Sequence, residues 1–233
     1  LNLLELVVQT SAGNDTIIIT DKIVMQVAQQ KLAIYDKGGE QHYDIISAFI
    51  KSIRGFDPDA AVYWLARMLV GGESLEFIGR RLLILASEDI GMANPQALLL
   101  ASATLESVAR IGYPEARIPL SQTTLYLSLS PKSNSAYLAI EAALEAVRQA
   151  GQQPPVPEAL SNPVTSMQKD LGYGQGYHYS HEGPHHFVHQ DFMPQSLRGR
   201  VFYQPADNER EQAYQRWLQD HWPEYTLGSS DSG

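Results

Sequence analysis

The chain has 233 residues, of which 44% are hydrophobic, so it is long enough to bury a core in one or two domains. It contains no cysteine, which excludes disulfide frameworks, thiol nucleophiles and thiolate metal sites. The formal net charge is −9, and this balance argues against a module that binds nucleic acid by itself. No apolar run approaches the roughly 20 residues that a membrane-spanning helix needs, so we expect no membrane segment.

The first predicted elements are a short extended segment and two helices. The β-branched run at residues 16–20 favours an extended backbone, and Thr20 is a suitable cap for a helix over about residues 21–35. Residues 43–53 repeat isoleucine and phenylalanine at spacings of three and four. That spacing predicts a helix with one apolar face.

Further helix starts share one pattern, which is a polar capping residue or a proline in the first turn. The positions that fit this pattern are Asp57-Pro58, Ser74, Asn94-Pro95, Pro119 and either Ser133 or Asn134. The last of these helices carries its large apolar residues on one side and ends before Gly151. Those residues are Tyr137, Ile140, Leu144 and Val147. From residue 23 to residue 150 the signals agree, and the predicted fold is mostly α, a helical bundle.

The composition changes at Gly151. Four prolines follow within residues 152–163, and residues 171–206 are rich in glycine, tyrosine, histidine and proline. We therefore predict an irregular segment over about residues 152–206 that includes a short hairpin. Residues 209–222 are predicted to form a last helix, and residues 228–233 a disordered tail.

The catalytic motifs that the sequence suggests do not meet their structural requirements. A P-loop places a Gly-Lys pair against the phosphates, and this chain has no Gly-Lys dipeptide, so we predict no nucleotide site in it. The run His181–His185 matches the zinc-protease pattern His-Glu-x-x-His, which has to lie on a helix. Proline at position 184 is incompatible with that helix. The adjacent acids Glu88 and Asp89 point in different directions on a helix, so we do not expect them to share an acid–base site.

A looser metal site in the histidine-rich region is an alternative, although we predict no metal ligand there. Its ligands would be His178, His181, His185, His186 and His189. A short histidine-rich tract suggests metal binding only by composition. The sequence therefore favours a polar loop whose histidines bond to backbone groups.

Residues 35–69, which read YDKGGEQHYDIISAFIKSIRGFDPDAAVYWLARML, closely resemble the replication-associated recombination protein A family, also called MgsA. The eukaryotic relatives of this family are the Werner-helicase-interacting ATPases. Further matching motifs are ASEDIGMANPQAL at 86–98, IGYPEARIPLSQ at 111–122, SPKSNSAY at 130–137, PVPEAL at 155–160 and GYGQGYHYSH at 172–181. Two features depart from the family pattern, namely Phe56, where a small residue is usual, and the histidines of residues 185–189.

The resemblance implies a AAA+ ATPase related to clamp loaders, with an ATPase domain, a helical lid and a C-terminal oligomerisation domain. Residues 1–50 would then be the remainder of the lid, and residues 51–233 a C-terminal domain resembling the clamp-loader collar. The chain would begin inside a longer protein. We expect no cofactor in this portion, and ATP with Mg²⁺ in the full-length protein. The implied partners are other copies in a homotetramer, DNA, and replication proteins such as single-strand-binding protein. The implied location is the cytoplasm, in association with the bacterial nucleoid.

Three functions follow for the chain itself. The first is an oligomerisation module of a AAA+ ATPase that acts in DNA replication, recombination and repair at stalled forks. The second is a contact module for DNA or a partner protein, for which the candidate residues are Lys51, Arg54, Arg80, Arg81 and Lys132. The third, which the sequence favours least, is an independent metal-dependent enzyme.

Overall fold

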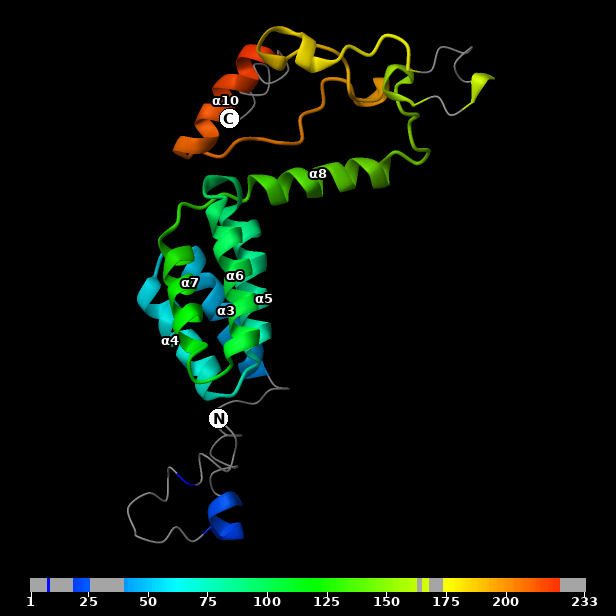
Figure 1. Cartoon of the computed structure of the whole chain (residues 1–233). Coiled ribbons are helices and arrows are strands. Elements are labelled where there is room, and N and C mark those ends of the chain that lie inside the picture. Colours follow the sequence, from blue (N-terminus) through cyan, green and yellow to red (C-terminus); the bar gives the residue numbers. More distant parts are fainter. Residues whose placement is uncertain (1–7, 9–18, 26–39, 163–164, 168–173, 223–233) are drawn as a thin grey trace. The chain divides into compact units, whose positions relative to one another are not determined.

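The computed structural model describes residues 8, 19–25, 40–162, 165–167 and 174–222 (Figure 1). The chain divides into two compact units, residues 1–134 and residues 135–233. The described residues are helical or irregular and contain no β-strand, so the predicted mostly α fold is confirmed. None of the helices among them is both long enough and apolar enough to cross a membrane.

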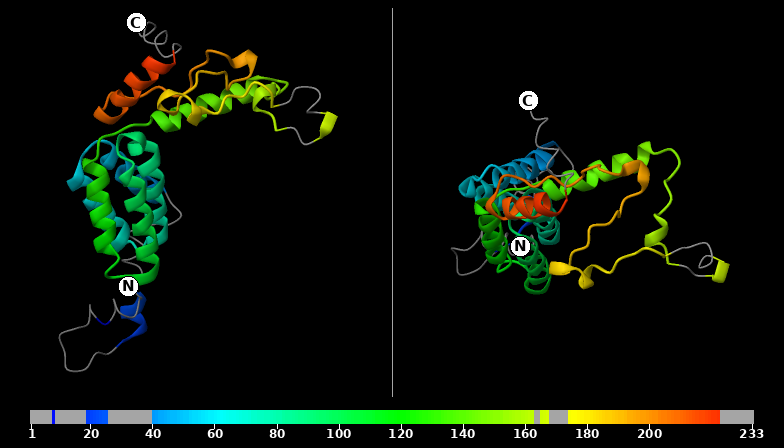
Figure 2. Two further views of the ribbon diagram at one scale, coloured as in Figure 1. Left: turned by 45° about the horizontal axis from the view of Figure 1, so that its top comes forward. Right: turned by 90° about the horizontal axis from the view of Figure 1, so that it is seen from above.

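The first unit contains a bundle of helices that lie side by side (Figures 1 and 2). Its helices are α3 (Glu40–Arg54), α4 (Pro58–Val70), α5 (Leu75–Leu85), α6 (Gln96–Ile111) and α7 (Arg117–Leu129). A π-helical turn, η1 (Ala86–Ile90), and a 3-10 turn, η2 (Gly91–Ala93), connect α5 to α6. Helix α3 packs against α4 and α7, while α5 packs against α6. The predicted domain limit near residue 50 lies inside α3, and the division into a lid remainder and a C-terminal domain stays a prediction.

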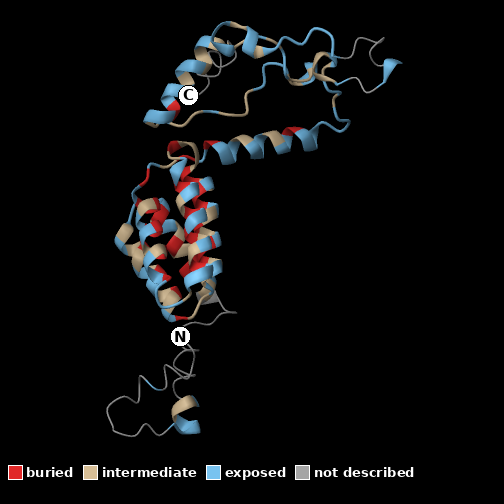
Figure 3. Ribbon diagram, viewed as in Figure 1, coloured by how far each residue is buried: buried red, intermediate tan, exposed pale blue. Residues whose placement is uncertain are grey.

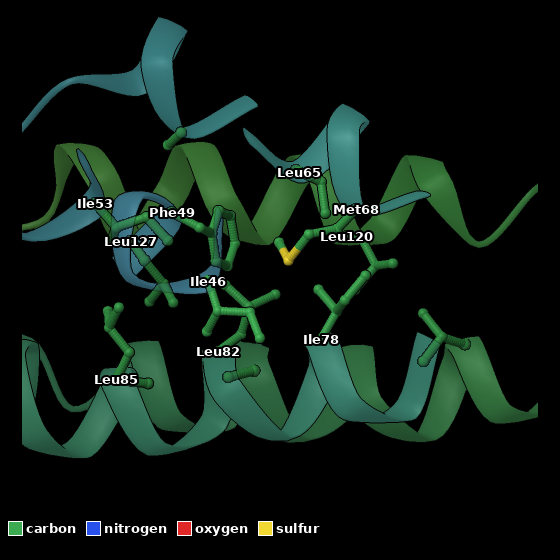
Figure 4. Packing of buried hydrophobic residues seen from close by; sticks show 14 of the residues in the cluster. Ile46, Phe49, Ile53, Leu65, Met68, Ile78, Leu82, Leu85, Leu120 and Leu127 are labelled. Atoms are coloured by element: carbon green, nitrogen blue, oxygen red, sulfur yellow. The ribbon is translucent and has the colours of Figure 1, made fainter. Parts of the chain in front are cut away.

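The core of this bundle is made by apolar side chains on the facing sides of its helices. Figure 4 shows side chains from α3, α4, α5 and α7 meeting between the helices. The buried members that it labels are Ile46, Phe49, Ile53, Leu65, Met68, Ile78, Leu82, Leu85, Leu120 and Leu127. Removing a side chain of this size from water stabilises the fold by roughly 1.5–3 kcal/mol.

Gly79 sets how closely α5 and α6 approach each other. A Cβ atom at this position would lie 2.8 Å from Cδ1 of Leu105 on α6. Any other residue at position 79 would therefore require the Leu105 side chain to move.

Two of the predicted helix caps are confirmed. The Asp57 carboxylate accepts a hydrogen bond from the backbone N–H of Ala60 at 2.9 Å, at the start of α4. The Ser74 hydroxyl accepts one from the N–H of Phe77 at 3.2 Å, at the start of α5. Each side chain satisfies a backbone donor that has no partner within the helix.

Other predicted helix starts were wrong. Helix α6 begins at Gln96 without a side-chain cap, and the amide nitrogen of Asn94 donates to Tyr126 and Ser130. Helix α7 begins at Arg117, two residues before Pro119, since a proline in the first turn costs no hydrogen bond within the helix. The helix predicted over 43–53 spans 40–54.

Where the structure describes the second unit, it contains two α-helices with defined bounds, a short helical stretch at residues 166–167 and several 3-10 turns. The α-helices are α8 (Ser135–Gln149) and α10 (Glu209–His221), and both agree with the predicted helical regions. The 3-10 turns are η3 (Glu158–Leu160), η4 (Ser180–Glu182), η5 (Pro184–His186) and η6 (Gln195–Leu197). The irregular character of residues 152–206 is thus confirmed where the structure describes them. The hairpin was wrong for those same residues, because prolines and glycines weaken strand pairing.

Near the N-terminus, residues 21–25 are helical and Thr20 precedes them. Its hydroxyl accepts a hydrogen bond from the N–H of Ile23 at 3.4 Å, as the predicted cap requires. The extended segment at 16–18, the remainder of this helix from residue 26, and the tail at 228–233 lie outside the described residues.

Candidate functional site

The five basic residues predicted to contact DNA or a partner do not form one cluster. Lys51 on α3 and Arg80 on α5 are exposed, and Arg81 is partly buried. Arg54, in contrast, donates a hydrogen bond to the buried carboxylate of Asp89 at one end of the bundle. Burial lowers the pKa of Lys132, and the negative charge of the same carboxylate opposes this effect. The prediction of a DNA contact stays a prediction for all five residues.

Arg54 is held at the end of α3 by a two-pronged ion pair. Its Nε atom donates to Oδ1 of Asp89 at 2.5 Å, and a terminal nitrogen donates to Oδ2 at 3.2 Å. A further ion pair joins Arg54 to Glu88 at 3.6 Å. The hydrogen bond to Asp89 raises the pKa of the Arg54 guanidinium, against the opposing effect of burial. A planar guanidinium that pairs with two carboxylates is fixed in orientation. Arg54 therefore serves mainly to join α3 to η1.

Lys132 closes the C-terminal end of α7. Its ammonium group donates to the carbonyl oxygens of Leu127 at 3.0 Å, Ser128 at 3.0 Å and Ser130 at 2.7 Å. The last carbonyls of a helix have no partner within it, and a cation also interacts favourably with that end of the helix dipole. Burial lowers the pKa of Lys132 to about 8, although the charge of Asp89 acts in the opposite direction.

Phe56, which we predicted to depart from the family pattern, covers this ammonium group. The Nζ atom of Lys132 lies 3.6 Å from the centre of the Phe56 ring, which is a cation–π contact. Phe56 has a φ of 61°, and the backbone N–H groups of Phe56 and Asp57 donate to the carbonyls of Ile53 and Ser52. This is the hydrogen-bond pattern of a helix that ends in a Schellman motif, where glycine is the usual residue. The contact with Lys132 gives a physical reason for phenylalanine in this strained position.

A polar network ties the start of α6 to the end of α7. The Asn94 amide donates to the Tyr126 hydroxyl at 2.9 Å and to Ser130 Oγ at 3.3 Å, and the Tyr126 hydroxyl donates to Gln96 at 3.4 Å. The backbone N–H of Ser133 donates to the Asp89 carbonyl at 2.7 Å. The motifs at 86–98 and 130–137 therefore meet at one end of the bundle.

We call the residues Arg54, Phe56, Asp89, Asn94 and Lys132 the motif-end network. Arg54 and Asp89 satisfy each other, Lys132 donates to backbone carbonyls, and Asn94 donates to the hydroxyls of Tyr126 and Ser130. No nucleophile within it is paired with a base. The arrangement therefore closes and stiffens one end of the bundle.

The described part of the histidine-rich region contains two short 3-10 turns. The run from His181 to His185 is divided between the 3-10 turns η4 and η5, and His185 and His186 have positive φ angles of 56° and 59°. The prediction that this run does not form the zinc-protease helix is confirmed. The described residues contain no group of three or more potential metal ligands.

Helix α8 exposes its large apolar residues rather than burying them. Its sheltered face consists of small residues, namely Ser135, Ala139, Ala143 and Ala146. The larger residues form the α8 stripe, which comprises Tyr137 (46% exposed), Ile140 (54%), Leu144 (38%) and Val147 (50%). Figure 3 shows exposed residues along much of this helix. The spacing of three, four and three residues is that of a helix–helix seam.

The buried carboxylate of Glu211 in α10 was not among the predicted site residues. It accepts hydrogen bonds from Ser135, from Tyr203 at 3.0 Å and from the amide of Asn208 at 2.6 Å. Burial, followed by the bond to Glu211, raises the pKa of the Tyr203 phenol far above its ordinary value. The signal in the sequence was Asn208-x-x-Glu211, the capping-box spacing at a helix start.

Comparison with known proteins places these features in a family. The family model described as MgsA AAA+ ATPase C terminal matches residues 55–222, and that described as AAA C-terminal domain matches residues 1–54. Helix α4, the motif-end network from Phe56 onward, the α8 stripe and α10 all lie within the first of these matches.

The relatives carry AAA and replication-associated names. An uncharacterised AAA domain-containing protein of Mycobacterium tuberculosis is 49% identical over 74% of this chain and 38% of its own length. The replication-associated recombination protein A of Bacillus subtilis is 43% identical over 88% of this chain and 49% of its own length. The ATPase WRNIP1 of Dictyostelium discoideum is 38% identical over 84% of this chain and 23% of its own length.

The chain spans about half the length, or less, of these relatives. The first family model covers well over half of the chain. The similarity to the family therefore extends over a whole folded region and is not limited to one motif. The chain therefore belongs to the MgsA family of AAA+ ATPases, the family of replication-associated recombination protein A.

Proposed function

We propose that this chain is the self-assembling portion of a AAA+ ATPase that serves DNA replication and recombination, and that α8 provides a contact between copies. The observation that carries the proposal is the exposed α8 stripe, whose residues are 38–54% exposed. A helix in water normally turns its large apolar side chains inward and its small ones outward. Helix α8 does the opposite, which supports burial of the stripe against a second protein surface.

The spacing of the stripe favours a helix as that surface. Residues 137, 140, 144 and 147 occupy the two apolar positions of successive seven-residue repeats. A second copy of the chain presents an identical stripe, and symmetric self-association is the commonest way to bury such a surface. The assembly that the family resemblance implies is a homotetramer.

Assembly of this kind has a purpose in the longer protein. We propose that it holds ATPase subunits together so that each nucleotide site, with its ATP and Mg²⁺, lies beside a neighbouring subunit. Action on DNA at stalled forks, contact with single-strand-binding protein and a cytoplasmic location belong to the same proposal. In this proposal the motif-end network has no catalytic role. It stabilises one end of the helical bundle.

The test is the solution mass of this chain, measured by light scattering over a dilution series. A mass near four times the 25.9 kDa of one chain at high concentration, falling on dilution, is the expected result. A chain that stays monomeric at every concentration would sink the proposal and would favour contacts made elsewhere in the longer protein.

A further inference from the structure

The second unit contains a pocket that neither the helical bundle nor the α8 stripe explains. It has a volume of about 350 Å³ and lies between the segment 191–203 and the end of α10. Its lining is mostly apolar and aromatic, with charged groups from residues 191, 198 and 200. The apolar members are Phe192, Met193, Val201, Phe202, Leu218 and Trp222. A volume of this order is at the lower end of the range for binding pockets.

The walls of this pocket are fixed by contacts outside it. Tyr203 lines the pocket with its ring while its hydroxyl donates to the buried carboxylate of Glu211 at 3.0 Å. Trp222 is held by its backbone N–H, which donates to the Leu218 carbonyl at 2.7 Å, and by the ring of Phe187 at 5.6 Å. A pocket whose walls are already in place loses little entropy when it is filled.

The charges at the pocket leave one cation in excess. Arg198 donates to the carboxylate of Asp191 at 2.5 Å, so these two groups neutralise each other. Arg200 lies 5.4 Å from the ring of Phe202 in a cation–π contact. The charge at this pocket is therefore positive, although the net charge of the whole chain is −9. It is complementary to a ligand that combines an apolar group with an anion.

We infer that this pocket binds a short peptide segment of a partner protein, in which a large apolar side chain lies next to a carboxylate. The apolar side chain would enter among Phe192, Phe202 and Trp222, and the carboxylate would pair with Arg200. Arginine and aromatic residues are the groups that dominate binding energy in protein interfaces. A nucleic-acid base is the less suitable occupant, because the polar groups that could read its edge, Asp191 and Arg198, already bond to each other.

The proposal is tested by fluorescence anisotropy on the whole chain with three probes. The first is the fluorescein-labelled peptide amide Gly-Ser-Asp-Glu-Leu-Phe, and the second replaces its Leu-Phe by Ser-Ser. The third is a fluorescein-labelled oligothymidine. We expect saturable binding of the first probe only.

Two matched variants locate the binding. Arg200→Glu reverses the charge at the pocket and is expected to weaken binding of the first peptide at least about tenfold, as the loss of one charge-assisted hydrogen bond predicts. Arg216→Glu makes the same change at an exposed position of α10 that does not line the pocket, and should leave binding within about twofold. Both positions are exposed, so both variants should keep the wild-type circular dichroism spectrum.

Each other outcome would overturn the proposal. Equal affinity for both peptides would show that the pocket does not recognise the apolar side chain. Equal effects of the two arginine variants would place the site elsewhere, and saturable binding of oligothymidine without the peptide would make this face a nucleic-acid interface instead. Failure of the first peptide to bind saturably would leave the pocket without the proposed ligand, whatever the solution mass of the chain.

Discussion

Replacing Ile140 by glutamate should dissociate the assembly that we propose for this chain. Ile140 is the most exposed residue of the α8 stripe, at 54%, and it occupies the middle of the stripe together with Leu144. A charge at this position would have to be buried when two stripes meet, while the single helix would still expose it to water. The variant should therefore act on association and not on the folding of one copy.

The size of the effect follows from the exposure of the stripe. Full burial of a large apolar side chain contributes roughly 1.5–3 kcal/mol. About half of each stripe residue remains exposed in one copy, so each offers about 1 kcal/mol on association. Glutamate at position 140 removes one such contribution and adds a desolvation cost of several kcal/mol. We expect the dissociation constant to rise at least about a hundredfold.

The assay is sedimentation velocity or light scattering over a dilution series, with Ala142→Glu as the matched control. Ala142 is an exposed residue of the same helix outside the stripe, so the control adds the same charge without entering the seam. The reasoning would be refuted if both variants dissociated alike, or if Ile140→Glu kept the wild-type mass at every concentration. Equal circular dichroism spectra would show that each copy remains folded.

Three further predictions concern the interior of the two units. Arg54→Met should lower the free energy of unfolding by about 1–3 kcal/mol, because it leaves the Asp89 carboxylate, 8% exposed, without its guanidinium, while solvent around the half-exposed Arg54 reduces the loss. Urea unfolding measures this, and Lys51→Met, at an exposed position of the same helix, should change stability by less than about 0.5 kcal/mol. Lys132 should titrate near pH 8 in the folded chain, as followed by NMR of its side chain. Because the unfolded chain keeps that proton up to the ordinary lysine pKa of 10.5, stability should gain a contribution as the pH rises from about 8 towards 10, and Lys132→Met should remove that contribution. Glu211→Ala should destabilise the second unit by about 3 kcal/mol in thermal unfolding, since three donors lose a buried acceptor, and an unchanged melting temperature would contradict this account.

The motif-end network suggests why some family motifs contain charged residues that make no catalytic site. Arg54, Asp89 and Lys132 come from three motifs separated in the chain. Arg54 bonds to Asp89, while Lys132 donates to backbone carbonyls at the end of α7 and lies over the Phe56 ring. A basic residue in such a motif can therefore serve the bundle itself. Lys51, which makes no such contact among the described residues, and the exposed Arg80 are the better candidates for a contact with phosphate.

The sequence by itself determined the helices and much of the core. Apolar residues repeated at spacings of three and four correctly predicted the buried face of α3, because the period of an α-helix is fixed by its backbone. Asp57 and Ser74 were correctly placed as caps, since a cap acts on the N–H groups only a few residues further along. The family was also predicted correctly, because its motifs are short, contiguous runs of residues that can be read directly from the sequence.

Tertiary structure alone decided which polar groups meet. Asn94 has the sequence of a cap, yet its amide bonds to Tyr126, which lies 32 residues away in the chain. Arg54 looked like part of a basic patch, but it pairs with Asp89 35 residues further along, and Ser135 bonds to Glu211 across 76 residues. Whether a polar side chain faces water or a partner depends on the packing of helices that are remote in sequence, and so does the exposure of the α8 stripe. No local pattern contains that information, because burial is a property of the assembled bundle and not of one helix.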